Sequence, residues 1–323
     1  MVSIRDIAKK AGVSVTSVSY ALNGNPKVSR KTTEHIKRIA EELNYRPNAA
    51  ARTLKARRTK KIGIFIRESG GGIFFGEILA GVIEMCAKEG YDTVVCVGAN
   101  ASDHLADGSV DGGLIMDPLI TSEEITQLAD SGRKIVVLDR TFYHKHVRQV
   151  LIDNEKGARQ MVEHLAKYDA EKTYIVTGSH KNFDSQKRLK SALDAYAENA
   201  PTVDVQVIEG VFHLGGGLEA AEIIDQQWSG GPVNVFALSD SIAVGMQRYF
   251  QEKGYQIGTD IRIAGFDNDL LSQYITPPLT TINYSSKVWG TEAARVLLQL
   301  IVDEEVENVL IPTSLMERDS TSG

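Results

Sequence analysis

IRDIAKKAGVSVTSVSYALNGNPKVSRKTTEHIKRIAEELNYRPNAAARTL, residues 4–54, is the stretch that decides the fold at the amino end of this chain. Its first part predicts a short helix, because Ser3 and Asp6 have capping-box spacing and apolar residues then recur on one helical face. Gly12 ends that helix, since glycine enters a left-handed turn without a Cβ penalty. Ser14 then begins a second helix that continues to about Leu22.

A third helix completes the predicted head. The segment 23–26, Asn-Gly-Asn-Pro, breaks the chain, and Ser29 caps a helix from Arg30 to Leu43 with an apolar stripe on one face. The turn between the first two helices is short, as is typical of helices that cross at a steep angle. Residues 1–46 are therefore predicted to form a small all-α helix-turn-helix head.

The charge of the amino-terminal segment is opposite to that of the rest of the chain. Residues 1–61 carry 15 Lys and Arg against 4 Asp and Glu, whereas the remainder carries 21 against 38. A basic end on an acidic protein indicates contact with a polyanion, because Lys and Arg at phosphates release condensed counterions. The acidic body discourages the other faces of the protein from binding the same polymer.

The second helix presents short polar side chains that suit the major groove of DNA. Thr16 or Tyr20 can hydrogen-bond base edges there, and Val15 can contact a thymine methyl group. The alternative is a small helical bundle with a solvated basic surface, but charge, helix lengths and turn chemistry together favour DNA. The candidate DNA-contacting residues of the head are Ser14, Val15, Thr16, Ser19, Tyr20 and Asn23.

Residues 47–60 are predicted to form a hinge helix and linker. The run Ala49–Leu54 is too short to be a stable helix alone in water, so it would fold only against a dimer mate or DNA. Leu54 is suited to wedging between base steps in the minor groove. A plain flexible linker with Leu54 resting on the body is the other interpretation, and the residues leave both open. The candidate hinge contacts are Asn48, Ala51 and Leu54.

The chain as a whole has the composition of an ordinary globular protein, with 42% hydrophobic and 24% charged residues. Cys86 and Cys96 are too few for a disulfide framework or a four-thiolate metal site, and we expect both to be buried and reduced. No apolar run approaches the length of a membrane span, and no export signal is visible. We therefore expect a cytoplasmic protein without membrane contact.

Residues 61–323 are predicted to form one body of two interleaved α/β lobes. Strand-like runs IGIFI, TVVCV, GGLIM and KIVVLD form a first series, and TYIVTG, VQVIEG, NVFAL and IRIAGF form a second. Helices are expected near residues 75–88, 122–131 and 155–167, and in the second series near 185–198, 217–228, 241–253 and 286–304. This alternation predicts two doubly wound parallel-sheet lobes, with ligands beyond the carboxyl ends of the strands.

Residues at the strand ends, or on the elements that follow them, are candidates for a ligand site between the lobes. They are Asp139, Arg188, Phe212, Ser239 and Asp267. This mixture suits a polyol, because carboxylates accept from hydroxyls, a guanidinium donates in a fixed fork, and an aromatic ring covers the apolar side of a sugar. We interpret Asp240 as a helix N-cap rather than a ligand contact, and expect Arg188 at the exposed end of its helix.

The chain resembles the lactose-repressor/galactose-repressor (LacI/GalR) family of bacterial transcription regulators. The matching segments follow the family's order over essentially the whole chain: IRDIAKKAGVSVTSVSYALNG, YRPNAAARTL, VVLDR, DNEKGARQMVEHL, ALSDSIAVG, IRIAGFDN and PPLTTI. The resemblance implies a dimeric repressor with a periplasmic-binding-protein-like body, whose operator affinity is set by a small ligand. It implies base reading by Val15, Thr16 and Tyr20, intercalation by Leu54, and effector contact by Phe74, Asp139, Arg188, Phe212 and Asp267.

Three departures from the family pattern bear on these sites. Tyr20 stands where many members have arginine, which removes a guanine contact and predicts a different operator. The loop at 67–72 reads RESGGG where relatives have a Pro-Asp-Asn-type segment; it could admit an anion such as a sugar phosphate, although a mobile loop is the favoured interpretation. The segment 100–110 is too short for the helix that relatives place there, so this lobe should keep at most a turn.

No catalytic or cofactor-binding arrangement is recognisable, and we predict no enzyme activity, cofactor or metal site. His144 and His146 form the only close histidine pair, interpreted as a solvated loop. A solute receptor without DNA function is the competing class, disfavoured by the basic head. The sequence thus predicts a homodimeric repressor on palindromic double-stranded operator DNA of a carbohydrate-utilisation operon. A sugar or sugar phosphate is the expected effector, with a nucleobase or another non-sugar ligand as the alternative.

Overall fold

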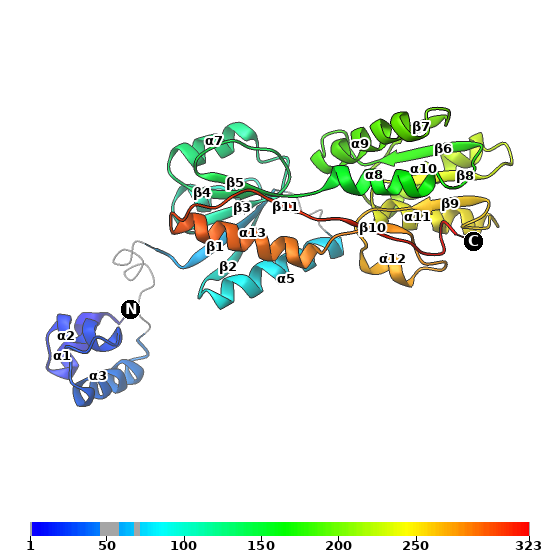
Figure 1. The fold of residues 1–323 in the computed structure, drawn as a ribbon. Helices are drawn as coiled ribbons and strands as arrows, with labels where there is room; N and C mark the ends of the chain where they lie inside the picture. The colour runs from blue at the N-terminus through cyan, green and yellow to red at the C-terminus, as the bar shows by residue number, and fades with distance from the viewer. Residues whose placement is uncertain (1, 46–57, 68–71, 323) are drawn as a thin grey trace. The chain divides into compact units, whose positions relative to one another are not determined.

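The computed structural model describes residues 2–45, 58–67 and 72–322, apart from the side chains of residues 72–74. The chain divides into two compact units, Met1–Thr59 and Lys60–Gly323. Figure 1 shows a small helical head in the first unit and a body of two lobes in the second. The candidate hinge contacts Asn48, Ala51 and Leu54 lie outside the described residues.

The head contains the three predicted helices, α1 (Ile4–Ala11), α2 (Val15–Leu22) and α3 (Arg30–Glu42). Their predicted ends are confirmed. Gly12 adopts a left-handed conformation with φ of 65° after α1, and the Ser14 and Ser29 hydroxyl oxygens accept from the third amide along, which caps α2 and α3. Each helix turns its apolar stripe to one small core, formed by Ile7, Ala8, Val18, Ala21, Ile36, Ile39 and Ala40.

The first lobe of the body is built on a wholly parallel sheet, whose strand order is β2-β1-β3-β4-β5-β11. Its strands are β1 (Lys61–Ile66), β2 (Asp92–Val97), β3 (Gly112–Ile115), β4 (Lys134–Val137), β5 (Val147–Ile152) and β11 (Val309–Ile311). The four strands predicted from the first apolar series are confirmed. β5 and β11 were not predicted.

The second lobe has a four-stranded parallel sheet in the order β7-β6-β8-β9. All four strands were predicted: β6 (Lys172–Thr177), β7 (Val205–Glu209), β8 (Val233–Ala237) and β9 (Ile261–Ala264). An unpredicted antiparallel pair, β10 (Thr281–Asn283) with β12 (Ser314–Met316), lies beside this lobe. Both lobes thus have the predicted doubly wound α/β architecture.

The helices of the body follow the predicted order, with one unpredicted short helix, α12. They are α5 (Gly72–Lys88), α6 (Asp103–Ala106), α7 (Ser122–Asp130), α8 (Asn154–Leu165), α9 (Phe183–Asn199), α10 (Leu214–Gln227), α11 (Asp240–Glu252), α12 (Leu270–Tyr274) and α13 (Ser286–Ile301). The expectation for the short segment 100–110 is confirmed, because α6 is a single turn. Leu105 on that turn is fully buried and helps to close this side of the first lobe.

One assignment from the sequence is wrong. α13 follows the strands of the second lobe along the chain, yet it packs in the first lobe against α5, β3, β4 and β5. The two helices approach closely because each has a glycine against the backbone of the other: a Cβ added at Gly81 would lie 2.0 Å from the Lys287 carbonyl oxygen, and one at Gly290 would lie 2.0 Å from the Ile78 carbonyl oxygen. The chain therefore crosses between the lobes after β5, after β10 and after β11.

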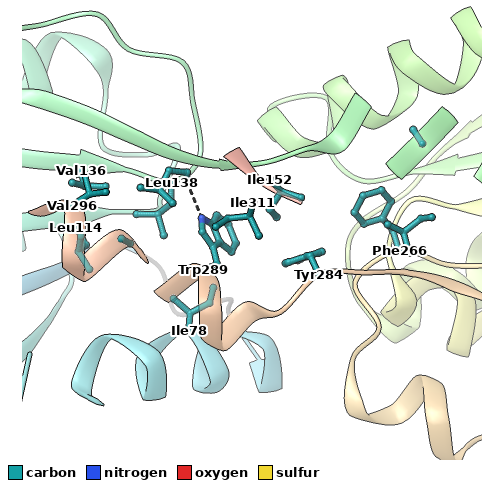
Figure 2. Packing of buried hydrophobic residues seen from close by; sticks show 14 of the residues in the cluster. Ile78, Leu114, Val136, Leu138, Ile152, Phe266, Tyr284, Trp289, Val296 and Ile311 are labelled. Atoms are coloured by element: carbon teal, nitrogen blue, oxygen red, sulfur yellow. Dashed lines mark hydrogen bonds between the residues drawn. The ribbon is translucent and has the colours of Figure 1, made fainter. Parts of the chain in front are cut away.

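The two lobes share one continuous hydrophobic core. Trp289 on α13 is fully buried, and its indole Nε1 donates to the Val150 carbonyl oxygen of β5 at 2.7 Å. Figure 2 shows Tyr284, which lies on the second crossover, between Trp289 and Phe266 of the second lobe. The ring centroids are 6.1 Å apart for Tyr284 and Trp289 and 6.2 Å apart for Tyr284 and Phe266. Aromatic packing thus joins the lobes next to the candidate ligand site.

Candidate functional site

The exposed face of α2 carries the predicted DNA-reading residues of the head. Val15 and Thr16 at its first turn are exposed, and Tyr20 one turn later is half-buried. The ammonium of Lys27 lies 5.7 Å from the centroid of the Tyr20 ring, so a positive charge lies close to this aromatic face. The arrangement presents an apolar contact and hydroxyl groups from one short helix, as major-groove reading requires.

The other predicted head contacts have local structural partners. The Ser14 hydroxyl oxygen accepts from the Ser17 amide at 3.0 Å as the cap of α2. The Asn23 side-chain amide donates to the Ser19 carbonyl oxygen at 2.7 Å and thereby closes the end of the same helix. Ser14, Ser19 and Asn23 therefore fix the two ends of the helix that presents Thr16 and Tyr20.

Arg188 is the centre of the candidate ligand site in the body. It lies on the second turn of α9 and is only 3% exposed, so the expectation that it sits at the exposed end of its helix is wrong. Its guanidinium lies 3.7 Å from the centroid of the Phe266 ring. Nη1 donates to the Leu238 carbonyl oxygen at 2.8 Å and to the Asp267 carboxylate at 3.1 Å. Burial on an aromatic face and these acceptors hold the guanidinium in one orientation.

Asp267 follows β9 and faces Arg188. Its Oδ1 atom accepts from Arg188 and, at 3.0 Å, from the Tyr284 hydroxyl. Burial raises the pKa of this carboxyl group to about 6, although Arg188 and Tyr284 oppose the rise. The backbone of Asp267 has φ of 124°, a conformation that costs energy in a residue other than glycine. Strain and a perturbed carboxyl at the carboxyl end of a parallel strand are typical of a functional position.

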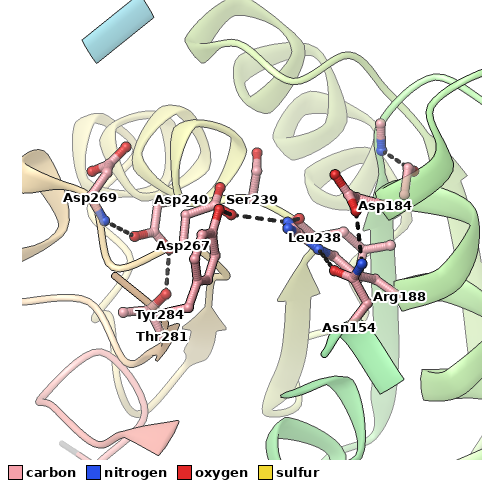
Figure 3. A network of polar contacts seen from close by, with 12 residues as sticks. Asn154, Asp184, Arg188, Leu238, Ser239, Asp240, Asp267, Asp269, Thr281 and Tyr284 are labelled. Carbon is pink, nitrogen blue, oxygen red and sulfur yellow. Dashed lines mark hydrogen bonds and ion pairs between the residues drawn. The ribbon is translucent and has the colours of Figure 1, made fainter. Parts of the chain in front are cut away.

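Two residues that the sequence reasoning did not single out extend this network, as Figure 3 shows. The Asn154 side chain accepts from Arg188 Nε at 2.8 Å and donates to Asp184 Oδ1 at 2.7 Å. Burial raises the pKa of Asp184. The network therefore runs from Asp184 through Asn154, Arg188 and Asp267 to Tyr284.

Ser239, and not Asp240, caps α11. Ser239 is the N-cap of α11, because its hydroxyl oxygen accepts from the Ile242 amide at 3.4 Å. Asp240 is the first residue of the helix and is fully buried, where it accepts from the Thr281 hydroxyl at 2.5 Å and from the Asp269 amide at 2.9 Å. The interpretation of Asp240 as the cap is therefore wrong, and its carboxylate ties three segments of the second lobe together.

Asp139 lies at the carboxyl edge of the first sheet and forms an ion pair with its neighbour Arg140, with Oδ2 2.7 Å from Nη2. Burial raises the pKa of Asp139, Arg140 opposes the rise, and Asp184 adds to it. Asp184 of the second lobe thus acts electrostatically on this carboxyl group of the first lobe. Arg140 also donates to the carbonyl oxygens of Asp117 and Ile120.

Of the two aromatic candidates, the structure describes the side chain of Phe212 but not that of Phe74. The Phe212 ring packs against the cores of the body and rests on the backbone of Gly178, where an added Cβ would lie 2.4 Å from it. Phe74 belongs to the first turn of α5, and its side chain lies outside the described residues. The loop 68–71 is likewise outside them. Phe212 is thus the aromatic residue that the structure places beside β6 and β7.

Within residues 2–45, 58–67 and 72–322, no group of three or more His, Cys, Asp or Glu side chains could hold a metal ion. In the described part of the chain, no helix has the length and apolarity needed to cross a bilayer. His146 bonds through Nδ1 to the Ala129 carbonyl oxygen at 2.8 Å, and His144 lies 3.3 Å from Asp130.

Comparison with known proteins identifies both units. Residues 3–48 match the family described as bacterial regulatory proteins of the lacI family, and residues 162–321 match the periplasmic binding protein-like domain. The repressor PurR of Vibrio vulnificus is 31% identical over 315 residues, covering 94% of this chain and 93% of that protein. The ribose operon repressor of Haemophilus influenzae is 33% identical over 328 residues, covering 98% of each.

A solved structure supports the same conclusion. The Lac repressor dimer bound to its operator and an anti-inducer superposes with a TM-score of 0.87 at 25% identity, covering 100% of this chain and 99% of that one. LacI-family repressors bind operator DNA and small-molecule effectors and act as dimers. The chain belongs to the LacI family of bacterial regulatory proteins and is a DNA-binding transcriptional repressor.

Proposed function

We propose that this repressor controls a carbohydrate-utilisation operon and that a sugar bound between the two lobes sets its affinity for the operator. The observation that carries the proposal is the Arg188–Asp267 pair, held at 3.1 Å on the carboxyl edge of the second sheet. Such a pair supplies a donor and an acceptor in fixed positions, which neighbouring hydroxyl groups of a sugar can satisfy together. The name of the Haemophilus influenzae relative, a ribose operon repressor, agrees with this class of ligand.

Two residues that bond to this pair lie at the crossovers between the lobes. Asn154 lies directly after the first crossover between the lobes, and Tyr284 lies on the second. Both bond to the Arg188–Asp267 pair. A sugar that competes for these two side chains would change the angle between the lobes, and through it the spacing of the two hinge segments in a dimer. The proposed hinge contacts are Asn48, Ala51 and Leu54.

Exposed apolar side chains support a homodimer formed by the body. In the first lobe, Ile83 of α5 is 48% exposed, and Val95 and Val97 on the edge strand β2 are 40% and 58% exposed. In the second lobe, Leu270 and Tyr274 at the two ends of α12 are 56% and 77% exposed. Apolar surface of this kind, present in both lobes, fits a partner that is a second copy of the same chain.

The experiment compares operator binding of the full chain and two arginine variants. Fragments of the promoter region next to the repressor's own gene are titrated by fluorescence anisotropy, with and without ribose, glucose or adenine. The wild-type protein should prefer one fragment over random duplex, and one sugar should change that affinity at least tenfold, or about 1.4 kcal/mol. Arg188→Ala should retain operator binding and lose the response, because the fixed donor is gone.

Arg159→Ala is the matched control. Arg159 lies on α8 and forms an ion pair with Glu198 on α9 at 2.6 Å, with its own side chain 30% exposed. It should retain both operator binding and the response to sugar. A fully responsive Arg188→Ala protein would remove that residue from the site, and a response to adenine alone would contradict the sugar assignment. No preference for any promoter fragment would contradict the proposed operator.

A further inference from the structure

The described residues of the candidate effector site offer more free hydrogen-bond acceptors than donors. Each of Asp184 and Asp267 accepts hydrogen bonds from described residues through Oδ1 only. The donors are largely committed, because Arg188 uses Nε and Nη1 within the network. Arg140 uses all three of its nitrogens on Asp139 and on two carbonyl oxygens. Among the described residues of this network, a ligand therefore meets one free oxygen on each of Asp184 and Asp267, and the Nη2 edge of the Arg188 guanidinium.

Among the described residues of the network, carboxylates also outnumber guanidinium groups. Asp139 is paired with Arg140, and Asp267 is paired with Arg188. Asp184 has no ion-pair partner among the described residues, and the only hydrogen bond that it accepts from them comes from the neutral Asn154 amide. Burial raises the pKa of Asp184, and the nearby Arg188 guanidinium opposes the rise. The negative charge of Asp184 in turn raises the pKa of both Asp139 and Asp267.

Asp184 is positioned for selectivity by the helix that also carries Arg188. The two residues are four positions apart on α9, so their side chains share one face of the helix. Asn154 holds both, donating to one and accepting from the other. Figure 3 shows Asp184 and Arg188 both bonded to Asn154. A ligand group that reaches the guanidinium therefore comes next to the unpaired carboxylate.

We propose that Asp184 is a specificity-determining residue that restricts the effector to sugars without an anionic group. A phosphate or carboxylate near Arg188 would meet Asp184 in a site of low dielectric, where like charges repel strongly. Hydroxyl groups donate to the two free carboxylate oxygens, and an ammonium group on the sugar would gain an ion pair with Asp184. This inference rests on the proposed function of the site, and it excludes the sugar phosphate that the sequence left open.

The test measures binding directly, so that its outcome does not depend on the operator. Full-length wild-type and variant proteins are titrated by calorimetry with two matched sets: ribose with ribose 5-phosphate, and glucose with glucosamine and glucose 6-phosphate. In at least one set the neutral or amino sugar should bind wild-type protein at least tenfold more tightly than the phosphate ester. Asp184→Asn should reduce that ratio at least tenfold, because the amide preserves shape and removes the charge.

Asp194→Asn is the matched control. Asp194 lies on the same helix, is 44% exposed and pairs with Lys190 at 2.5 Å, so the variant makes the same change in net charge outside the site. It should keep the wild-type ratio. The inference is overturned if in both sets the phosphate ester binds wild-type protein as tightly as its parent sugar, if Asp184→Asn leaves the ratio unchanged, or if no neutral or amino sugar binds. Failure of the proposed function would differ, since sugars would then bind without changing operator affinity.

Discussion

Replacing Asp267 with asparagine should stabilise the repressor at neutral pH while removing its response to the effector. The pKa of the Asp267 carboxyl is raised from 3.8 to about 6, chiefly by burial. Between these two values the folded protein keeps a proton that the unfolded chain has lost. The contribution of this carboxyl group to wild-type stability is therefore fully present below about pH 4 and is lost as the pH rises through 6. The asparagine side chain does not titrate, so its contribution to stability does not change with pH. Its Oδ1 atom still accepts from Arg188 and Tyr284.

The size of the effect follows from the pKa shift. A rise of about two pH units corresponds to about 3 kcal/mol, at about 1.4 kcal/mol per unit. The difference in unfolding free energy between Asp267→Asn and wild type should thus grow by about 3 kcal/mol between pH 4 and pH 7. Loss of the ion pair with Arg188 changes stability only while Asp267 is ionised, and that contribution is already contained in the shifted pKa.

Urea unfolding followed by tryptophan fluorescence measures this difference. The two tryptophans, Trp228 and Trp289, both lie in the body, so the signal reports the unit that contains Asp267. Titrations at four or five pH values between 4 and 7.5 give the two stability curves, and thermal unfolding should show a relative gain of roughly 6–12 °C for the variant at the upper end. A difference that stays constant with pH would refute the argument, because it would mean that Asp267 titrates alike in the folded and unfolded states.

Two further predictions concern the hinge and the helix pair. Leu54→Ser should weaken operator binding at least tenfold in anisotropy titrations while leaving sugar affinity intact, and unchanged operator affinity would remove the wedge role from Leu54. Gly81→Ala should lower the free energy of unfolding by about 1–3 kcal/mol, because the methyl group would meet the Lys287 carbonyl oxygen at 2.0 Å. Its control, Gly76→Ala on the same helix, has nothing within 4 Å and should gain up to about 1 kcal/mol, so equal effects would contradict the packing argument.

The head was predictable because every signal in it is local. Capping serines, a glycine at a helix end and the apolar stripes act within one or two turns, and the structure confirms the helix ends that they indicate. The strands of the two sheets were predictable for a related reason, since strands buried on both faces are continuous apolar runs. β5 was missed because its sequence, VRQVLI, interrupts the apolar run with Arg148 and Gln149. β10, β11 and β12 have three residues each, too few to show a period.

The course of the chain between the lobes was not predictable from local pattern. Sequence order suggested that α13 covers the second sheet, but packing is decided by complementary surfaces, here the close approach at Gly81 and Gly290. The same limit applies to the candidate site. Arg188 and Asp267 could be found because they follow strand ends, whereas Tyr284 reaches the site from a crossover. Asp184 had a usable signal, its spacing of four residues from Arg188 on one helix.

The arrangement of the network explains how one small ligand could act on the whole body. Arg188 and Asp267 both belong to the second lobe. A ligand that contacted only these two residues would therefore not act on the first lobe. Asn154 and Tyr284 change this, because each lies at a crossover and bonds directly to one of the pair. Tyr284 also packs edge-on against Trp289, which donates to the backbone of β5 in the first lobe. On the proposed function, a ligand that changes the contacts of this tyrosine would favour one lobe angle over another.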